Sequence, residues 1–175
     1  MREAAGPPTR ETRQLLLRAA TDADVEALFA IQGDADAMRF TYCAPHREAT
    51  RAFLESYAAR FAEDGYAPWL ALLRADGRVV GWGGLHRDPK EPHWGTEVAY
   101  FVARACWGRG LAGEIVAASL ALAFGELGLA EVGAFTRPAN RASARVLVRA
   151  GFERVGYEPR LERDRYLLRA PRNNP

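Results

Sequence analysis

Residues 96–114 read T-E-V-A-Y-F-V-A-R-A-C-W-G-R-G-L-A-G-E, and they indicate the fold more directly than any other part of the chain. The first seven residues are typical of a strand, because they are rich in valine and aromatic side chains. Glycines follow at positions 108, 110 and 113, and the apolar segment 111–127 then predicts a long helix. The sequence therefore predicts a strand, a glycine-rich turn and a helix in direct succession.

The glycine-rich turn is a candidate anion site. The first N–H groups of a helix have no intrahelical partner, and the helix dipole is positive at that end. Arg104 and Arg109 add positive charge. The spacing G-x-G-x-x-G also fits a dinucleotide loop, but it comes late in the chain and outside a βαβ unit. A P-loop is excluded because no Gly-Lys precedes Ser or Thr, so a different phosphate site and a plain tight turn stay open.

A second motif, N-R-A-S, occupies residues 140–143 and precedes a short apolar pattern that ends at Gly151. Asn140 is the only asparagine outside the last three residues, and Ser143 is one of only three serines. Asparagine is a favoured helix N-cap, so a structural role is one interpretation. A contact with a ligand is compatible with that role.

The remaining pattern predicts one domain over residues 14–169, with a flexible arm at 1–13 and a tail at 170–175. The arm contains two prolines and shows no periodicity. The order of the predicted elements indicates an α/β sheet of mixed strand direction covered by helices. The predicted strands are 15–18, 69–73, 79–85, 96–102, 131–136, 152–157 and 161–168, and the predicted helices are 21–32, 50–63, 111–127 and 142–150.

Composition narrows the class of protein. The chain has 175 residues, of which 49% are hydrophobic and 26% are charged, as in ordinary globular proteins. Cys43 and Cys106 are too few for a disulfide scaffold, and the three histidines lack the spacing of metal ligands, so no metal is expected. No segment has the pattern of a membrane span, and the polar N-terminus lacks the apolar core of a secretory signal. We therefore expect a cytoplasmic protein with no membrane partner.

Positive charge is concentrated near the C-terminus. Residues 137–175 carry 10 basic and 4 acidic side chains, whereas residues 1–136 carry 14 and 18. Local positive charge can hold an anion, and both nucleic acid and a phosphorylated cofactor are anions. A solvated arginine-rich surface is the other interpretation. No nucleic-acid-binding motif accompanies the charge, so direct binding to nucleic acid is not expected.

Together, residues 96–114 and the run N-R-A-S-A-R-V-L-V-R-A-G-F at 140–152 resemble the GNAT superfamily of acyl-CoA-dependent N-acyltransferases. The resemblance covers about residues 14–169 and is to the RimJ/RimL-like branch, which acetylates the N-termini of ribosomal proteins. It implies the GNAT fold, an α/β (α+β) architecture with a mixed, mostly antiparallel central sheet of about seven strands. Helices would cover both faces, and strands four and five, 96–102 and 131–136, would splay apart.

The resemblance also implies an activity. An enzyme of this kind uses acetyl-CoA and moves the acetyl group directly to a primary amine, here a protein N-terminus or a small amine, as a monomer or homodimer. The alternative is a non-catalytic acyl-CoA-binding or sensor module of the same fold. Many GNAT enzymes carry a tyrosine seven residues after the motif asparagine, and this chain has Leu147 there.

By the same resemblance, the cofactor lies in the cleft between the splayed strands. Its pantetheine arm would pair with the strand backbone and with the motif asparagine, and its phosphates would lie on the glycine-rich turn. The residues expected to contact it are Phe101, Val102, Ala103 and Asn140 for the pantetheine arm, Trp107, Gly108, Arg109, Gly110, Leu111, Ala112 and Gly113 for the pyrophosphate, and Arg145 or Arg141 for the nucleotide phosphates.

Acetyl transfer needs a base for the amine proton and an acid for the departing thiolate. The resemblance suggests Glu97 as the base, with Glu162 or water as alternatives, although Glu97 also fits a surface carboxylate. Ser143 matches the position of the acid in the RimL-like branch, with water or Tyr157 as alternatives. The acceptor pocket is expected between residues 38–46 and the last hairpin. Its candidate lining residues are Tyr42, Trp82, His86 and Tyr100, of which Trp82 fits a core position equally well.

Overall fold

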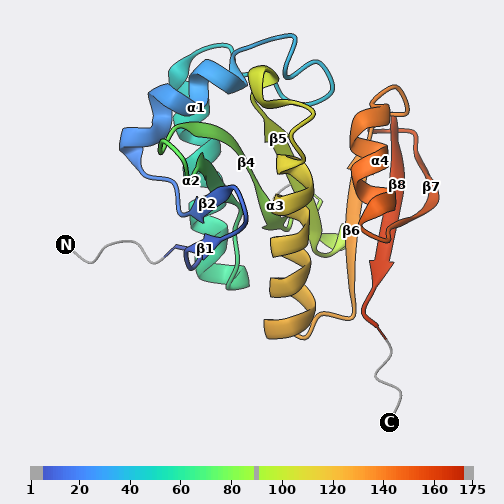
Figure 1. Ribbon diagram of the computed structural model, residues 1–175. Coiled ribbons are helices and arrows are strands. Elements are labelled where there is room, and N and C mark those ends of the chain that lie inside the picture. The colour runs from blue at the N-terminus through green and yellow to red at the C-terminus, as the bar shows by residue number, and fades with distance from the viewer. Residues whose placement is uncertain (1–5, 89–90, 172–175) are drawn as a thin grey trace.

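The computed structural model describes residues 6–88 and 91–171, which build one eight-stranded sheet with helices on both faces (Figure 1). Across the sheet the strands follow the order β1-β2-β3-β4-β5-β6-β8-β7. Neighbouring strands are antiparallel except β5 and β6, which run parallel. The predicted mixed, mostly antiparallel sheet is therefore confirmed. The strands are β1 (Arg10–Glu11), β2 (Leu15–Arg18), β3 (Trp69–Leu73), β4 (Val79–His86), β5 (Glu97–Val102), β6 (Glu131–Thr136), β7 (Glu153–Glu158) and β8 (Arg163–Arg169).

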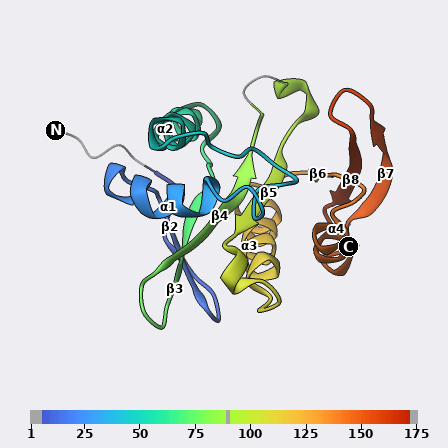
Figure 2. The ribbon, with the colours of Figure 1, turned by 90° about the horizontal axis from the view of Figure 1, so that it is seen from above.

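Two α-helices cover each face of the described sheet (Figure 2). On one face lie α1, Val25–Gln32, and α2, Arg47–Asp64. On the other face lie α3, Leu111–Leu120, and α4, Arg141–Arg149. A π-helical turn over Ala121–Glu126 extends α3, so the predicted long helix is one continuous segment of two kinds of helix.

Alternating side chains of β3 supply the apolar cores on both faces. Trp69, Ala71 and Leu73 pack in the core beneath α3, whereas Leu70 and Leu72 pack beneath α1 and α2. Successive side chains of a strand point to opposite faces, so a strand covered on both sides is apolar throughout. All five residues are buried, which explains the unbroken run W-L-A-L-L.

The strands β5 and β6 separate soon after they meet. Their register contains a single pair, Glu97 opposite Gly133, next to a hydrogen bond of 2.8 Å from the Gly133 N–H to the Thr96 carbonyl. On its other edge, β5 pairs with β4 along its whole length, from Glu97 to Val102. The predicted splay of strands four and five is therefore confirmed, and it opens a gap in the middle of the sheet (Figure 1).

The described part of the predicted N-terminal arm is held against the sheet. Arg10 and Glu11 form β1, which pairs with β2, and the Trp69 indole N–H donates to the Pro8 carbonyl at 3.0 Å. The contact between Trp69 and Pro8 joins residues 61 positions apart, so no local pattern marks it. The prediction of a free arm is therefore wrong for this part. Residues 1–5, and 172–175 of the predicted tail, lie outside the described residues.

The two helices of the α1–α2 face begin differently from one another. Before α1, the Thr21 N–H donates to the Asp24 carboxylate at 2.8 Å, as the predicted capping box requires. The helix α2 begins at Arg47, three residues earlier than predicted, because His46 acts as its N-cap. The His46 Nδ1 accepts from the Ala49 N–H at 3.2 Å. Histidine is not among the usual N-cap residues, so the sequence pattern missed this start.

Candidate functional site

A cleft of about 470 Å³ occupies the gap between β5 and β6. Its walls come from β5, the glycine-rich turn, α4 and the segment before α2. Most residues predicted to contact a cofactor meet here, although they come from separate parts of the chain. Predicted site residues in its lining are Tyr100, Phe101, Val102, Trp107, Gly108, Gly110, Leu111, Ala112, Gly113, Asn140, Ser143 and Arg145.

The glycine-rich turn presents backbone donors to the cleft. Gly108 and Gly110 adopt positive φ angles of 75° and 80°, which side chains rarely tolerate. Gly110 is the N-cap of α3 and offers no side chain to its first N–H groups, and the first backbone bond back to the cap comes from Glu114. The N–H groups before Glu114 therefore point out of the helix end, which suits a phosphate.

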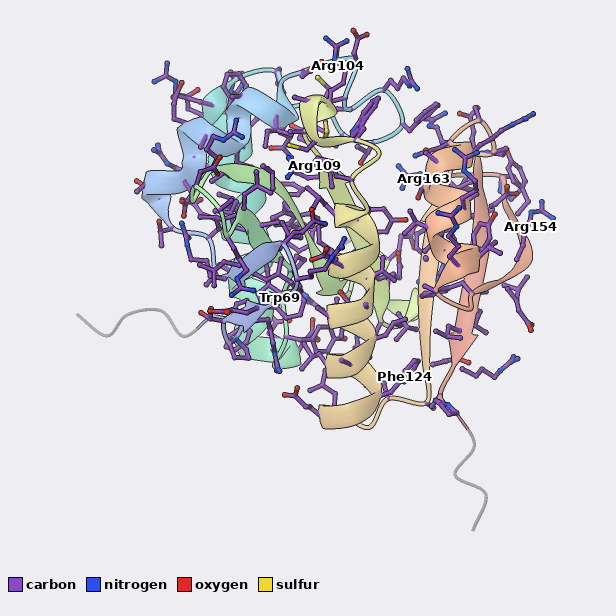
Figure 3. All side chains as sticks on the ribbon, viewed as in Figure 1. Trp69, Arg104, Arg109, Phe124, Arg154 and Arg163 are labelled. Atoms are coloured by element: carbon purple, nitrogen blue, oxygen red, sulfur yellow. The ribbon has the colours of Figure 1, made fainter. Side chains whose placement is uncertain are left out.

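The arginines near the turn have different surroundings. Arg104 and Arg109 both lie near the start of α3 (Figure 3). Arg104 forms an ion pair of 2.8 Å with Asp36, so its charge is already matched. Arg109 does not line the cleft; its Nη1 lies 3.9 Å from the Cys106 sulfur, and its carbonyl accepts from the side chain of Gln14. The turn therefore offers mainly backbone groups to an anion.

The segment between β1 and β2 supports the glycine-rich turn. The Gln14 Nε2 donates to the Arg109 carbonyl at 3.1 Å and to Glu114 Oε1 at 2.7 Å, and the Gln14 N–H donates to Glu114 Oε2 at 2.9 Å. Burial raises the pKa of Glu114, but hydrogen bonds from Thr12 and Gln14 outweigh it and hold that pKa below its usual value. The Glu114 carboxylate is thus bound by Thr12 and Gln14. Sequence reasoning missed Gln14, because nothing near it in the chain signals the contact.

Backbone direction decides which part of β5 can bind a ligand. The Ala103 N–H bonds the Val80 carbonyl of β4 at 2.8 Å, so in this antiparallel pair the odd-numbered residues direct their backbone groups to β4. Val98, Tyr100 and Val102 therefore direct theirs into the gap. The Val102 carbonyl already accepts from the Trp107 indole at 2.8 Å. Of the three residues predicted to pair with pantetheine, Phe101 lines the cleft although its backbone groups face β4, and Ala103 does not line the cleft.

The N-R-A-S motif and β5 meet through hydroxyl groups. The Asn140 Oδ1 caps α4 by accepting from the Ser143 N–H at 3.2 Å, as the motif predicts. The Ser143 Oγ lies 2.9 Å from the Tyr100 hydroxyl. Burial raises the pKa of Tyr100 to about 12, although the hydrogen bond with Ser143 opposes this shift. Tyr100, expected near the acceptor, therefore lies beside Ser143 as a neutral phenol.

On the opposite face of β5, a carboxyl group is buried without a strong partner. Glu97 is 6% exposed, and its Oε2 lies 3.9 Å from the Nε2 of His86. Its Oε1 has no hydrogen-bond partner among the described residues. Burial, with a smaller contribution from the Asp88 charge, raises the pKa of Glu97 to about 8, and burial lowers the pKa of His86 to about 4. Both groups are therefore neutral near pH 7, and Glu97 can exchange a proton near pH 8.

Glu97 and His86 do not line the cleft, and neither do the remaining predicted acceptor and proton-transfer residues. Trp82 is 3% exposed and packs against Phe53 with ring centroids 4.7 Å apart, so it is a core residue. Tyr42 is exposed, with its ring centroid 6.5 Å from that of Phe53. Glu162 pairs with Arg137 at 2.9 Å on the surface, and Tyr157 is exposed on β7.

The cleft also contains residues that sequence reasoning missed. Arg39, before α2, has its guanidinium 5.8 Å from the centroid of the Trp107 ring and so borders the glycine-rich turn. Phe135 of β6 lines the cleft and contacts Trp94, with ring centroids 4.9 Å apart. Arg163 enters from the start of β8. Only the general excess of positive charge near the C-terminus pointed toward Arg163.

Within residues 6–88 and 91–171, no helix combines the length and the apolar character needed to cross a membrane. The same residues contain no group of three or more His, Cys, Asp or Glu side chains that could hold a metal ion.

Known proteins share this arrangement. The acetyltransferase (GNAT) domain family matches residues 14–153. The uncharacterized N-acetyltransferase YoaA of Bacillus subtilis is 30% identical over 152 residues, which are 85% of each chain. The crystal structure of an acetyltransferase from Agrobacterium tumefaciens matches with a TM-score of 0.80 and 26% identity, over 94% of this chain and 95% of that one. RimL, a ribosomal L7/L12 alpha-N-protein acetyltransferase solved with coenzyme A, matches in fold, with a TM-score of 0.74 and 18% identity over 93% and 98% of the chains.

Proposed function

Because this chain belongs to the GNAT acetyltransferase family and is an N-acetyltransferase, we propose that it moves an acetyl group from acetyl-CoA directly to a primary amine. The amine is a protein N-terminus or a small molecule. The observation that carries the proposal is the glycine-rich turn at the start of α3, whose N–H groups open into the gap between β5 and β6. Acetyl-CoA is the donor of this family, and the related RimL fold holds coenzyme A.

The residues of the cleft fit such a donor. The backbone from Gly108 to Gly113 would hold the pyrophosphate. The glycines of this turn leave open space in place of side chains, and the N–H groups at the start of α3 are free to donate to a phosphate. The even-numbered residues of β5 would pair with the pantetheine arm, and Asn140 would contact it. Arg145 lines the cleft, and Arg141 lies one helical turn before it, so either would meet the nucleotide phosphates.

Glu97 fits the role of the base. Acetyl-CoA supplies the activated acyl group, and the amine must lose a proton to attack it. A carboxyl group with a pKa of about 8 accepts a proton more readily than an ordinary glutamate, directly or through a water molecule. The proton transferred from the amine neutralises Glu97, which is the state that its buried site favours.

Ser143 fits the role of the acid. Its hydroxyl would donate a proton to the departing thiolate, and the hydroxyl of Tyr100 would hold it in place. Backbone N–H groups of β5 that face the gap would donate to the carbonyl oxygen as negative charge develops on it. The match of Ser143 favours the RimL-like branch, and that finer assignment is part of this proposal.

Isothermal titration with acetyl-CoA, followed by thiol-release assays over peptides, amino acids, polyamines and aminoglycosides, tests the proposal. We expect binding, and thiol release with at least one amine class. Binding without release on any amine would favour the non-catalytic module instead. Failure to bind acetyl-CoA would contradict the assignment of the cleft itself.

A further inference from the structure

Arg163 is a cation of the cleft that forms no ion pair with the residues the structure describes. It is the first residue of β8, it is half-buried, and it lines the cleft. Its Nε is buried without a hydrogen-bond partner, and no ion pair joins its guanidinium to any side chain in the described part of the chain. In Figure 3, Arg163 lies across the gap from Arg109.

Three arginines from nearby segments are paired with carboxylates. Arg137 pairs with Glu162 at 2.9 Å, Arg154 with Asp164 at 2.6 Å, and Arg160 with Glu91 at 3.1 Å. Each of those arginines is more exposed or lies outside the cleft lining. Arg39, Arg145 and Arg149 also line the cleft, but these three side chains are exposed. Among the described arginines of the lining, Arg163 alone is half-buried, with a buried Nε that has no hydrogen-bond partner.

Strand register places Arg163 on the same face of the sheet as Glu97. Glu97 pairs with Gly133 of β6, and its side chain lies over that glycine: a Cβ atom added at Gly133 would be 3.6 Å from the Glu97 Cγ. Along β8, Asp164 and Tyr166 are buried, and Tyr166 belongs to the core beneath α3 and α4. Side chains alternate along a strand, so Arg163 points to the opposite face, which is that of Glu97.

The charges around Arg163 leave room for an anion. Burial lowers the pKa of Arg163, and Arg137 contributes to that shift. Glu97 and Asp88 act in the other direction, but neither forms an ion pair with Arg163, and the buried Glu97 is neutral near pH 7. Burying a charge without a partner is costly, and a carboxylate can offset that cost with paired hydrogen bonds to a guanidinium.

We propose that Arg163 binds a carboxylate of the acceptor, so that this enzyme acetylates amines that carry an anionic group near the reacting nitrogen. The inference rests on the proposed function and names the substrate class of that same site. A free amino acid and a peptide that begins with an acidic residue both have this chemistry. Polyamines and aminoglycosides lack the carboxylate, and their additional positive charges would meet Arg163.

Matched pairs of acceptors test this assignment. The thiol-release rate is measured for amino acids against their carboxamides, and for peptides that begin with Asp or Glu against those that begin with Asn or Gln. We expect kcat/KM to be at least about 10-fold higher for the carboxylate member of the preferred pair, which is the usual value of a charge-assisted hydrogen bond. A preference in the first set identifies free amino acids, and one in the second identifies acidic peptides.

Two variants assign the preference to Arg163. Arg163→Gln should reduce the ratio of carboxylate to amide to about one, mainly through KM, and Arg163→Lys should restore part of it. The control is Arg165→Gln, because Arg165 is exposed two residues further along the same strand and does not line the cleft. It should keep the full preference. Thermal unfolding and acetyl-CoA titration of each variant separate a folding defect from a loss of acceptor binding.

Several results would overturn the inference. One is a wild-type enzyme that acetylates amides or polyamines as well as carboxylate-bearing amines. Another is an Arg163→Gln variant that keeps the wild-type preference. If some amines react without such a preference, the proposed function stands and only the acceptor class is wrong. Absence of thiol release with every amine contradicts the proposed function, and with it the inference that rests on it.

Discussion

The hydroxyl groups of Tyr100 and Ser143 lie 2.9 Å apart, which joins the splayed edge of β5 to the first turn of α4. Leu147 stands where many GNAT enzymes carry a tyrosine, and it is 1% exposed within the core. The strand therefore supplies beside Ser143 a phenol that the helix lacks. This contact gives Ser143 a fixed partner and makes the pair a natural first target for mutation.

Replacing Ser143 with alanine should lower kcat by about 100-fold, because the departing thiolate loses its proton donor. The affinity for acetyl-CoA should change by no more than about twofold, since the Asn140 cap accepts from the backbone N–H of residue 143 and not from its hydroxyl. Steady-state kinetics and titration measure the two effects. Ser56→Ala, an exposed serine on α2, is the control. A loss of affinity with unchanged kcat would make Ser143 a binding residue.

Replacing Tyr100 with phenylalanine should lower kcat by roughly 5-fold, the value of one ordinary hydrogen bond. The expected effect is smaller than that of Ser143→Ala, because Tyr100 would hold the acid without being the acid itself. The KM for the amine should stay constant. An effect larger than that of Ser143→Ala would indicate that Tyr100 itself donates the proton.

The rate of acetyl transfer should depend on pH through Glu97. A base must be deprotonated to act, so kcat/KM should rise with pH and level off above about 8, the pKa to which burial raises Glu97. The Glu97→Gln variant should be about 100-fold slower and should lack this rise. Initial rates from pH 6 to 9.5 test the prediction. An unchanged profile in the variant would assign the base elsewhere, with Glu162 or water next in line.

The same carboxyl group should affect stability. Its pKa is about 8 in the folded state and near 4.5 when unfolded, so the folded state holds an extra proton between these values. Unfolding then releases a proton, and stability falls as pH rises toward 8. Between pH 6.5 and 8 the wild type should lose about 2 kcal/mol relative to Glu97→Gln. His86 is neutral in the folded state throughout this window and partly protonated when unfolded at pH 6.5, but its contribution is the same in both proteins and cancels in the comparison. Urea unfolding at both pH values measures the difference, and parallel curves for the two proteins would contradict it.

The glycine-rich turn should not tolerate a carboxylate. Gly110→Glu should abolish acetyl-CoA binding, because a negative side chain would stand at the proposed phosphate position. Gly110→Ala imposes the same positive φ without the charge, so it should cost about 1 kcal/mol of stability and retain part of the affinity. Gly125→Glu adds the same charge to an exposed position beyond the far end of α3 and should bind normally. Calorimetric titration with acetyl-CoA measures the affinity of the three variants. Normal binding by Gly110→Glu would contradict the placement of the pyrophosphate at this turn.

Local residue patterns predicted the strands of the sheet well where the pattern of apolar residues matches the pattern of buried positions. The strands β2, β3 and β6 begin and end at the predicted residues. The start of α2 was missed because its cap is His46, and β1 was missed because it has only two residues, both charged, and so shows no strand pattern. Most residues predicted to contact a cofactor line one cleft, because they lie in two continuous motifs that the fold brings together. Arg163 could not be predicted, because its burial depends on the pairing of β8 with β6, which no short stretch of sequence encodes.

The single residue pair between β5 and β6 has a consequence for how the molecule comes apart. Strands β1 to β5 and strands β6 to β8 are two hydrogen-bonded units that share only this point of the described sheet. Regions joined by few contacts open locally at lower free energy than the whole molecule. Amide hydrogens along the gap edges of β5 and β6 should therefore exchange faster than those of β3 and β4. A ligand that fills the gap would bridge the two units, so exchange at these edges would report its occupancy without any measurement of turnover.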